Sequence, residues 1–215
     1  MASSIAISVI NDLYSDQRVH RTCMVWEERG YEVILIGRKY PNSKELNRTY
    51  KIHRFNCFWN KGPLFYLEYQ IRLWAFLKNL KVDVYLSNDL DTLLPNVFWS
   101  LRNKLPLVYD SHEYFLGSPE IESRPVIKFI WSIAEKYAVP KVDFPVTVNS
   151  SISMQYYREY GKSFDVVRNI PLSPSSGFLF RNGSQQEKER IRVKLSLPLQ
   201  KTIWIIQGAG INVDR

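Results

Sequence analysis

The chain has 215 residues, 45% of them hydrophobic and 23% charged, so it can bury one complete α/β core and the start of a second, and its composition excludes intrinsic disorder. No apolar run reaches the roughly 20 residues of a membrane-spanning helix, and no basic leader with a cleavage site precedes the first predicted strand, so we expect a cytoplasmic protein. Its two cysteines, Cys23 and Cys57, form no metal-ligand pattern and are expected to be reduced, while the net charge of +8 points to an anionic partner.

Strands and helices are predicted to alternate along the first part of the chain. The hydrophobic pattern predicts strands at residues 5–10, 32–36, 51–55, 83–87, 105–110, 143–148 and 164–168, and helices at 17–29, 64–80, 92–102, 125–138 and 150–160. Strands separated by a helix cannot pair as hairpins, and right-handed crossovers give a mostly parallel sheet with helices on both faces. The predicted fold is therefore a Rossmann-like, doubly wound α/β domain.

The composition changes after residue 170. Residues 171–184 are rich in Pro, Ser, Gly and Asn and are predicted to form a linker. A charged helix at 185–195 and a strand at 202–207 follow, and the strand leads into a glycine turn of the kind that opens a phosphate-binding helix. We expect one domain at 1–170 and the truncated start of a second at 185–215.

Most of the excess positive charge lies between Arg38 and Lys81. This segment has ten basic residues against Glu45 and Glu68, and aromatic residues are interleaved with them. The pattern suits an anionic membrane surface, because lysine and arginine attract phosphate while aromatic rings lie at the interface. A solvated basic face over an ordinary core helix explains it equally well. No recognised nucleic-acid-binding motif is present, and nucleic acid is not an expected partner.

Ligands of open parallel sheets bind beyond the carboxyl ends of the strands, so the segments that follow strands are the candidate sites. The first, residues 11–18, contains no glycine, which argues against a nicotinamide or flavin cofactor bound by a GxGxxG turn. Asp16 is placed to cap the following helix. Arg18, on the first turn, could hold an anion or a sugar hydroxyl.

The segment after the fourth strand carries two carboxylates, Asp89 and Asp91. They resemble a DxD metal site, but further oxygen ligands are not identifiable and Asp91 is well placed as a helix N-cap, so no metal is expected. Asp89 could accept hydrogen bonds from substrate hydroxyls or be structural. After the strand at 143–148, Ser150 or Ser151 is the expected helix cap.

The strongest candidate site follows the fifth strand, where Asp110, Ser111, His112 and Glu113 are consecutive. His112 could exchange hydrogen bonds with a sugar hydroxyl or stabilise developing charge. Glu113 could orient His112 or bind an acceptor, and the alternative is that Asp110 and His112 only cap the loop. The chain has no GxSxG elbow, HExxH motif or P-loop lysine, which argues against hydrolase, zinc-enzyme and NTPase functions.

Several of these segments together resemble glycosyltransferase family 4. They are Asp-Gln-Arg-Val at 16–19, Arg-Gly-Tyr-Glu-Val at 29–33, Asn-Asp-Leu-Asp-Thr-Leu at 88–93, Tyr-Asp-Ser-His-Glu at 109–113 and Val-Arg-Asn-Ile-Pro at 167–171. The resemblance implies a GT-B enzyme, in which an N-terminal Rossmann-like domain binds mainly the acceptor and a C-terminal one binds mainly the nucleotide sugar. It further implies transfer with retention of configuration and no required metal.

The resemblance also implies roles for single residues. His112 is expected to contact the transferred sugar as the catalytic residue, and Gly208 and Arg215 are expected to bind the donor phosphates. The acceptor side is expected to be lined by Asp16, Arg18, Asp89 and Glu113. The chain departs from the family pattern in two places. Residues 12–17 replace a glycine-rich loop, and Ala209 stands where the family usually has a basic residue.

The sequence therefore predicts a fragment of a retaining, metal-independent glycosyltransferase that moves a sugar from a nucleotide-sugar donor to a cell-surface glycan or lipid-linked acceptor. The nucleotide sugar is a co-substrate, and no cofactor is expected. The protein is expected in the cytoplasm, at the inner membrane face if the basic aromatic segment binds lipid, and the fragment is expected to be inactive alone. The alternative is a non-catalytic Rossmann-like module that binds a glycan, a lipid or a protein partner.

Overall fold

A computed structural model describes residues 2–170 and 184–204 of the chain. The chain divides into two compact units, Met1–Asn169 and Ile170–Arg215. The strands of the first unit are β1 (Ser4–Asp12), β2 (Glu32–Lys39), β3 (Lys51–Asn56), β4 (Val84–Asn88), β5 (Leu107–Ser111), β6 (Phe144–Thr147) and β7 (Asp165–Val166). Its α-helices are α1 (Gln17–Glu28), α2 (Pro63–Lys78), α3 (Leu93–Asn103), α4 (Pro119–Glu122), α5 (Pro125–Ala138) and α6 (Ser150–Tyr160). Short 3-10 helices cover Leu90–Thr92, Phe115–Gly117 and Val139–Lys141.

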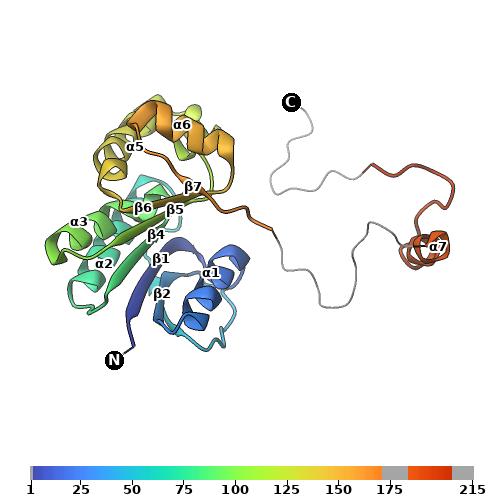
Figure 1. The fold of residues 1–215 in the computed structure, drawn as a ribbon, viewed down its shortest axis with the longest axis horizontal. Helices are drawn as coiled ribbons and strands as arrows, with labels where there is room; N and C mark the ends of the chain where they lie inside the picture. The colour runs from blue at the N-terminus through green and yellow to red at the C-terminus, as the bar shows by residue number, and fades with distance from the viewer. Residues whose placement is uncertain (1, 171–183, 205–215) are drawn as a thin grey trace. The chain divides into compact units, whose positions relative to one another are not determined.

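The strands form one seven-stranded sheet in the order β3-β2-β1-β4-β5-β6-β7, and every pairing is parallel. The chain runs outward from β1 to β3 and then returns to pair β4 with β1, so the winding direction reverses between β1 and β4. Figure 1 shows α2, α3 and α5 on one side of the sheet and α1 on the other. The predicted Rossmann-like, doubly wound α/β fold is confirmed.

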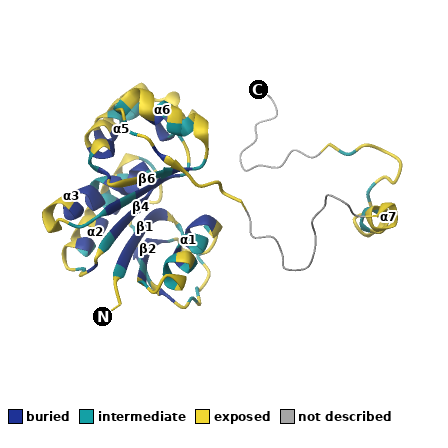
Figure 2. Ribbon diagram, in the orientation of Figure 1, coloured by how far each residue is buried: buried dark blue, intermediate teal, exposed yellow. Residues whose placement is uncertain are grey.

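Both faces of the sheet are buried, as expected for parallel strands that are covered by helices. The larger core packs Tyr69 and Leu73 of α2 and Val97 of α3 against the strands, and it extends to α5 and α6. The smaller core packs Val19 and Cys23 of α1 against β1 and β2. In Figure 2 the central strands are dark blue, while exposed residues lie on the outer surfaces of the helices.

The state of the two cysteines agrees with the sequence prediction, because both are free thiols. Cys23 is fully buried, and burial raises its pKa to about 12, so it stays a protonated core side chain. Cys57 is partly buried against the larger core.

The helix caps agree with the prediction in one case and differ in two. Asp16 caps α1 as predicted, since its carboxylate accepts a hydrogen bond of 3.0 Å from the Val19 N–H. The prediction for α6 was wrong, because the cap is Asn149, whose side chain accepts from the Ile152 N–H at 2.9 Å, and Ser150 is already helical. The prediction for Asp91 was also wrong, because it lies inside a 3-10 turn and α3 has no side-chain cap.

The second unit contains α7 (Gln185–Lys194), close to the predicted helix. Ser184 caps it by accepting a 3.3 Å hydrogen bond from the Glu187 N–H, and no residue of α7 is buried. Of the strand predicted at 202–207, residues 202–204 are not in a strand and the rest lie outside the described residues. The predicted donor contacts Gly208 and Arg215, and all of the predicted linker except Ser184, also lie outside the described residues.

Candidate functional site

The candidate site lies at the carboxyl edge of the sheet, where the strand order reverses. In doubly wound sheets this position is the usual ligand crevice. β4 and β5 pair in register up to Asn88 and Asp110, so their following loops start side by side. The Asn88 side chain donates to the Ser8 carbonyl at 3.0 Å, and Thr147 Oγ1 donates to the Ser111 carbonyl at 2.9 Å. These bonds hold the strand ends, and hence the site loops, at fixed positions.

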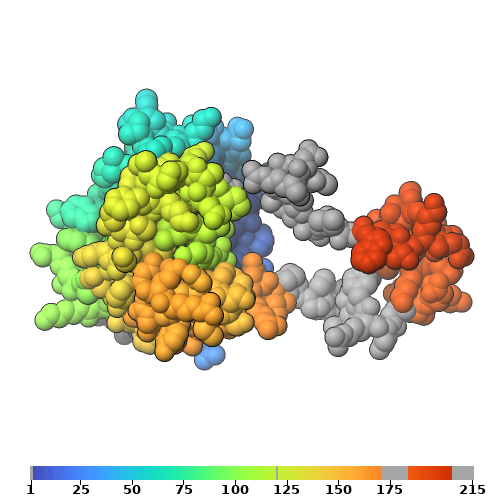
Figure 3. Space-filling model, turned by 90° about the horizontal axis from the view of Figure 1, so that it is seen from above, coloured from blue at the N-terminus to red at the C-terminus, as the bar shows by residue number. Residues whose placement is uncertain are grey.

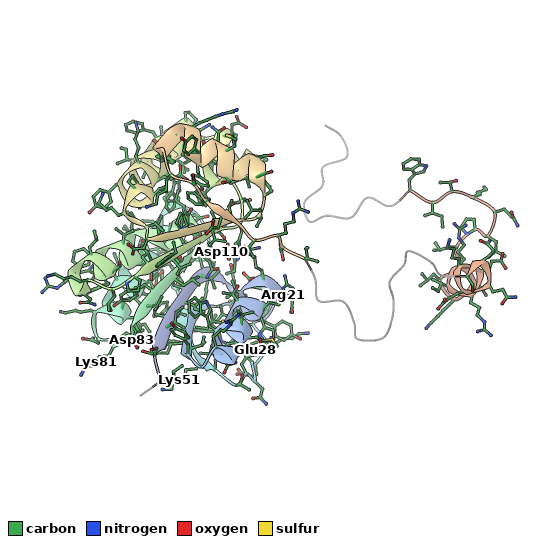
Figure 4. The ribbon with its side chains drawn as sticks, viewed as in Figure 1. Arg21, Glu28, Lys51, Lys81, Asp83 and Asp110 are labelled. Carbon is green, nitrogen blue, oxygen red and sulfur yellow. The ribbon has the colours of Figure 1, made fainter. Side chains whose placement is uncertain are left out.

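Asp110 is the electrostatic centre of the site. Arg18 donates two hydrogen bonds to it, from Nε to Oδ2 at 3.2 Å and from Nη2 to Oδ1 at 2.5 Å. Both side chains are 9% exposed, so this is a buried, bidentate ion pair. Arg18 Nη1 also donates to the Val167 carbonyl at 3.2 Å. The pair therefore ties the first turn of α1 to the end of β5 and to the segment after β7. Figure 4 shows Asp110 on the side of the sheet that faces α1 and its Arg21.

His112 lies between two carboxylates. Its Nδ1 is 3.3 Å from Asp89 Oδ2, and its Nε2 is 3.3 Å from Asp110 Oδ2. The His112 backbone N–H also donates to Asp89 Oδ1 at 2.8 Å, so Asp89 fixes both the loop and the ring. Nε2 is inaccessible to solvent and makes no hydrogen bond of good geometry, so a small rotation of the ring is needed before it can bond to Asp110 or to a ligand.

The carboxylates control the charge of His112. Burial alone would lower the pKa of His112, but the adjacent Asp110 and Asp89 carboxylates outweigh it and raise this pKa above 6.5. For Asp110 burial is outweighed by the adjacent His112 and Arg18 side chains, which lower its pKa. Burial raises the pKa of Asp89 to about 6, although His112 opposes the shift. The two carboxylates therefore favour the protonated form of His112, and Arg18 partly opposes it.

Asp89 adopts a strained backbone conformation, with φ 58° and ψ 171°. For a residue with a side chain this costs about 1–3 kcal/mol, and such strain is concentrated at functional sites. Two interactions maintain it: the Asp89 N–H donates to the Asp110 carbonyl at 3.0 Å, and the Asp89 carboxylate accepts from His112. The strained turn aims the Asp89 side chain at His112 rather than along the next helix.

A surface hollow of about 550 Å³ opens beside these groups. It brings together the predicted site residues Asp16, Arg18 and His112, whereas Asp89 and Glu113 do not line it. Asp89 lies behind His112, and the Glu113 side chain is exposed at the loop. Acceptor contacts by Asp16, Arg18, Asp89 and Glu113 stay predictions, but the geometry gives Asp89 a positioning role.

A second hollow of about 310 Å³ adjoins the first and shares Arg18, Arg21 and Asn169 with it. Its walls include Trp26 and the partly exposed sheet residue Val108. Arg21 Nη2 lies 2.5 Å from Asn169 Oδ1, so it borders both hollows from a fixed position.

Sequence reasoning placed Asp110 in the strongest candidate segment but missed its ion pair with Arg18, and it did not single out Arg21 or Asn169 as site residues. The available signal for Arg21 was its spacing, since it lies one helical turn after Arg18. In the described part of the chain, no group of three or more His, Cys, Asp or Glu residues could hold a metal ion.

A buried polar network supports the His112 loop from behind. Ser111 Oγ donates to the Glu113 carbonyl at 2.8 Å and is 3.0 Å from the Tyr156 hydroxyl. Tyr156 and Tyr160 donate to Glu135 at 3.2 and 2.6 Å. Glu135 is fully buried, and this burial raises its pKa to about 7. Through these bonds α5 and α6 restrain the loop that carries His112.

Comparisons with known proteins agree with the fold. The chain is similar to sucrose-phosphate synthase (tll1590) from Thermosynechococcus elongatus, with 15% identity and a TM-score of 0.60 over 91% of this chain and 53% of that chain. It is also similar to a UDP-N-acetylglucosamine 2-epimerase, with 9% identity and a TM-score of 0.52 over 77% of this chain and 48% of that chain. The chain thus spans about half the length of these proteins. At such low identities the similarity shows the shared fold alone. No curated protein matches the sequence.

The sequence also matches the profile of Glycosyltransferase Family 4 over residues 16–171. This stretch begins at the Asp16 cap and includes Arg18, Asp110 and His112. It therefore spans both the carboxyl edge of the sheet and the charged cluster described above. The predicted resemblance is confirmed, and the chain belongs to glycosyltransferase family 4.

Proposed function

We propose that the chain forms the acceptor side of a retaining glycosyltransferase, which transfers a sugar from a nucleotide-sugar donor to a cell-surface glycan or a lipid-linked acceptor without a metal. The observation that carries this proposal is the position of His112, which is held between Asp89 and Asp110 at the border of a surface hollow. A fixed hydrogen-bond donor whose protonated form is favoured suits sugar hydroxyls and negative charge that develops in a transition state.

The proposed reaction breaks the bond between the sugar and the donor diphosphate and forms a bond from the same carbon to an acceptor hydroxyl. The hydroxyl proton passes to the leaving diphosphate, so the chain needs no separate base. His112 donates a hydrogen bond to the transferred sugar, and Asp110 and Asp89 keep the ring charged and oriented. Arg18 and Arg21 supply positive charge at the hollow where the acceptor lies.

We also propose that the protein works at the cytoplasmic face of a membrane, in the synthesis of a polysaccharide. Among the described residues, no helix is both long and apolar enough to cross a bilayer. Association would then be peripheral, and a lipid-linked acceptor would be presented from the membrane surface.

The proposal is tested by transfer assays on the protein joined to a donor-binding domain. His112→Ala is expected to lower kcat by well over tenfold with a smaller change in KM, because the lost contact acts mainly in the transition state. His20→Gln, a histidine substitution on α1 outside the charged cluster, is the matched control. Unchanged turnover in His112→Ala removes this residue from the mechanism. Glycan binding without turnover in the wild type favours the non-catalytic module.

A further inference from the structure

The outward surfaces of α2 and α5 are apolar, although the core already buries the opposite side of each helix. On α2 the exposed residues are Leu64, Leu67, Ile71 and Trp74, between 40% and 59% exposed. They recur every three or four positions and therefore form one stripe. The inner side of the same helix is packed in the larger core. Packing within the domain thus leaves the outer stripe of α2 unexplained.

A loop of fixed shape extends the α2 stripe. Phe58 is 80% exposed, and its backbone N–H donates to both oxygens of Glu68 at 2.9 Å. The Trp59 N–H donates to Glu68 as well, at 3.0 Å, and Arg38 donates to the Trp59 carbonyl at 3.3 Å. Phe58 and Trp59 line a hollow of about 670 Å³ together with Leu64, Leu67 and Ile71. The two aromatic rings are therefore held at the surface by a buried arginine and a glutamate.

The stripe on α5 is more exposed. Val126, Phe129, Ile130, Ile133 and Tyr137 are between 53% and 73% exposed and share one side of the helix. The sequence pattern alone did not single out this stripe, because its residues read as an ordinary amphipathic core helix.

The two helices meet. The rings of Tyr66 and Trp131 pack edge to face with their centroids 5.5 Å apart. In the space-filling view of Figure 3, the turquoise of the α2 region borders the yellow-green of the α5 region. We call the two stripes, with Phe58 and Trp59, the α2–α5 surface.

The charges on these helices are divided by side. The acidic residues of α2 and α5 are Glu68 and Glu135. The Glu68 side chain is only 10% exposed and is engaged by Arg72 and two backbone N–H groups, and Glu135 is fully buried. Lys78 continues the α2 stripe one turn after Trp74, and Lys136 flanks the α5 stripe; both are exposed, whereas Lys128 is partly buried on the other side of α5. The outward side therefore carries apolar and positive groups and no acidic group free to repel an anion.

The basic segment that the sequence suggested contributes α2, Phe58 and Trp59 to this surface, but not all of its charges lie there. Arg38 is 1% exposed and lies between the rings of Tyr40 and Phe65, at 3.9 and 4.0 Å from their centroids. Lys51 pairs with Glu32. Part of the positive charge between Arg38 and Lys81 is therefore buried or already paired within the domain.

We propose that the α2–α5 surface docks the protein on an anionic lipid bilayer, which rests on the proposed lipid-linked acceptor. A bilayer matches both features, since large apolar side chains enter the interface while lysines meet anionic headgroups. A protein partner would require complementary acids and shape. A second copy would bring the same lysines against each other.

The test is cosedimentation of the chain with vesicles of phosphatidylcholine alone or mixed equally with phosphatidylglycerol. The chain is expected to sediment with the mixed vesicles and far less with phosphatidylcholine. Two double variants place charge in the apolar stripes: Phe129→Glu with Ile130→Glu on α5, and Leu67→Glu with Ile71→Glu on α2. Each is expected to lower the partition coefficient between water and the mixed vesicles by tenfold or more. Lys78→Gln with Lys136→Gln is expected to lower it by about tenfold and to weaken its salt dependence.

The matched control is Met154→Glu with Tyr157→Glu on α6, where the same change is made at side chains 52% and 54% exposed outside the α2–α5 surface. This control is expected to bind like the wild type, and circular dichroism confirms that every variant is folded. Equal binding by all variants, or no binding by the wild type, overturns the proposal. A wild-type dimer that the α5 variant dissociates, seen by light scattering, also overturns it in favour of a second copy. No donor or acceptor is present in the assay, so failure of transfer activity does not affect its result.

Discussion

Asp110 is the residue whose loss the site tolerates least, because it neutralises both Arg18 and His112. Asp110→Asn keeps the shape but leaves the Arg18 guanidinium buried without a counter-charge. Breaking a buried pair in this way costs about 3–5 kcal/mol, so the free energy of unfolding is expected to fall by that order in urea denaturation. The pKa of His112, followed by NMR, is expected to fall as well, because Asp110 is the main group that raises it.

The control for this prediction is Asp165→Asn, an exposed carboxyl on β7. Its effect is expected to stay within about 0.5 kcal/mol. If Asp110→Asn unfolds at the same urea concentration as this control, the Arg18–Asp110 pair is not holding the site together.

Glu135 makes stability depend on pH. Burial raises the pKa of Glu135 from 4.5 to about 7, so the folded state binds this proton more tightly than the unfolded chain. The stabilisation is complete below pH 4.5 and is lost as the pH rises through 7. This rise in the pKa of Glu135 from 4.5 to about 7 corresponds to about 3 kcal/mol. Glu135→Gln has no proton to lose there, so its stability is expected to fall less than that of the wild type across this range.

Urea denaturation at several pH values measures the effect, with the exposed Glu122→Gln on α4 as control. Parallel pH profiles for the wild type and Glu135→Gln would contradict the assignment. The raised pKa of His112 acts in the same direction, with stabilisation that is complete below pH 6.5 and lost as the pH rises through the folded value.

Sequence reasoning found single residues where the signal was local. Asp16 caps α1 because an aspartate directly before an amphipathic stretch is a local pattern. His112 was found because it follows a buried strand. The pairing of Asp110 with Arg18 was missed because the two residues are 92 positions apart, and only the sheet order brings them together. The positive φ of Asp89 could not be predicted, because tertiary contacts rather than its own propensity maintain it.

At the scale of elements, α6 gives a direct comparison between a predicted and an observed cap. Asn149→Ala removes the hydrogen bond to the Ile152 N–H and is expected to destabilise the first unit by about 1 kcal/mol. Ser150→Ala and Ser151→Ala, the caps that the sequence suggested, are expected to have effects within about 0.5 kcal/mol. Thermal or urea unfolding of the three variants ranks them, and a serine variant that costs more than Asn149→Ala would reverse the assignment.

The strands and helices themselves were mostly predictable, and their ends were less so. The strand at 105–110 and the helix at 125–138 appear as β5 and α5 within one or two residues, because each has a strong hydrophobic period. The helix predicted at 92–102 begins at Leu93, since a 3-10 turn occupies the preceding residues. The exposed stripe of α5 could not be predicted from the sequence, because hydrophobic periodicity does not say which apolar residues the neighbouring helices leave uncovered.

At the scale of the molecule, alternation of strands and helices was enough to predict a doubly wound parallel sheet. The reversal between β1 and β4 then explains why segments after β1, β4 and β5 meet in one site. The right-handed crossover of each strand–helix–strand unit and the need to cover both faces of the sheet produce this arrangement. It therefore follows from general rules more than from particular residues. The second unit could be predicted only in part, because α7 has no buried face that would tie its sequence to a core.

The first unit is expected to fold without the second. All buried hydrophobic residues among those described lie between Ile5 and Phe164, and the Arg18–Asp110–His112 cluster lies in the same stretch. Removing residues 170–215 is therefore expected to leave the urea midpoint of the first unit and the NMR-measured pKa of His112 unchanged. The matched comparison is removal of residues 164–215, which also deletes β7 and the buried Phe164 ring that stacks on Tyr156 at 4.2 Å. This longer deletion is expected to lower the midpoint clearly. If both deletions lower the urea midpoint equally, the second unit contributes to the stability of the first.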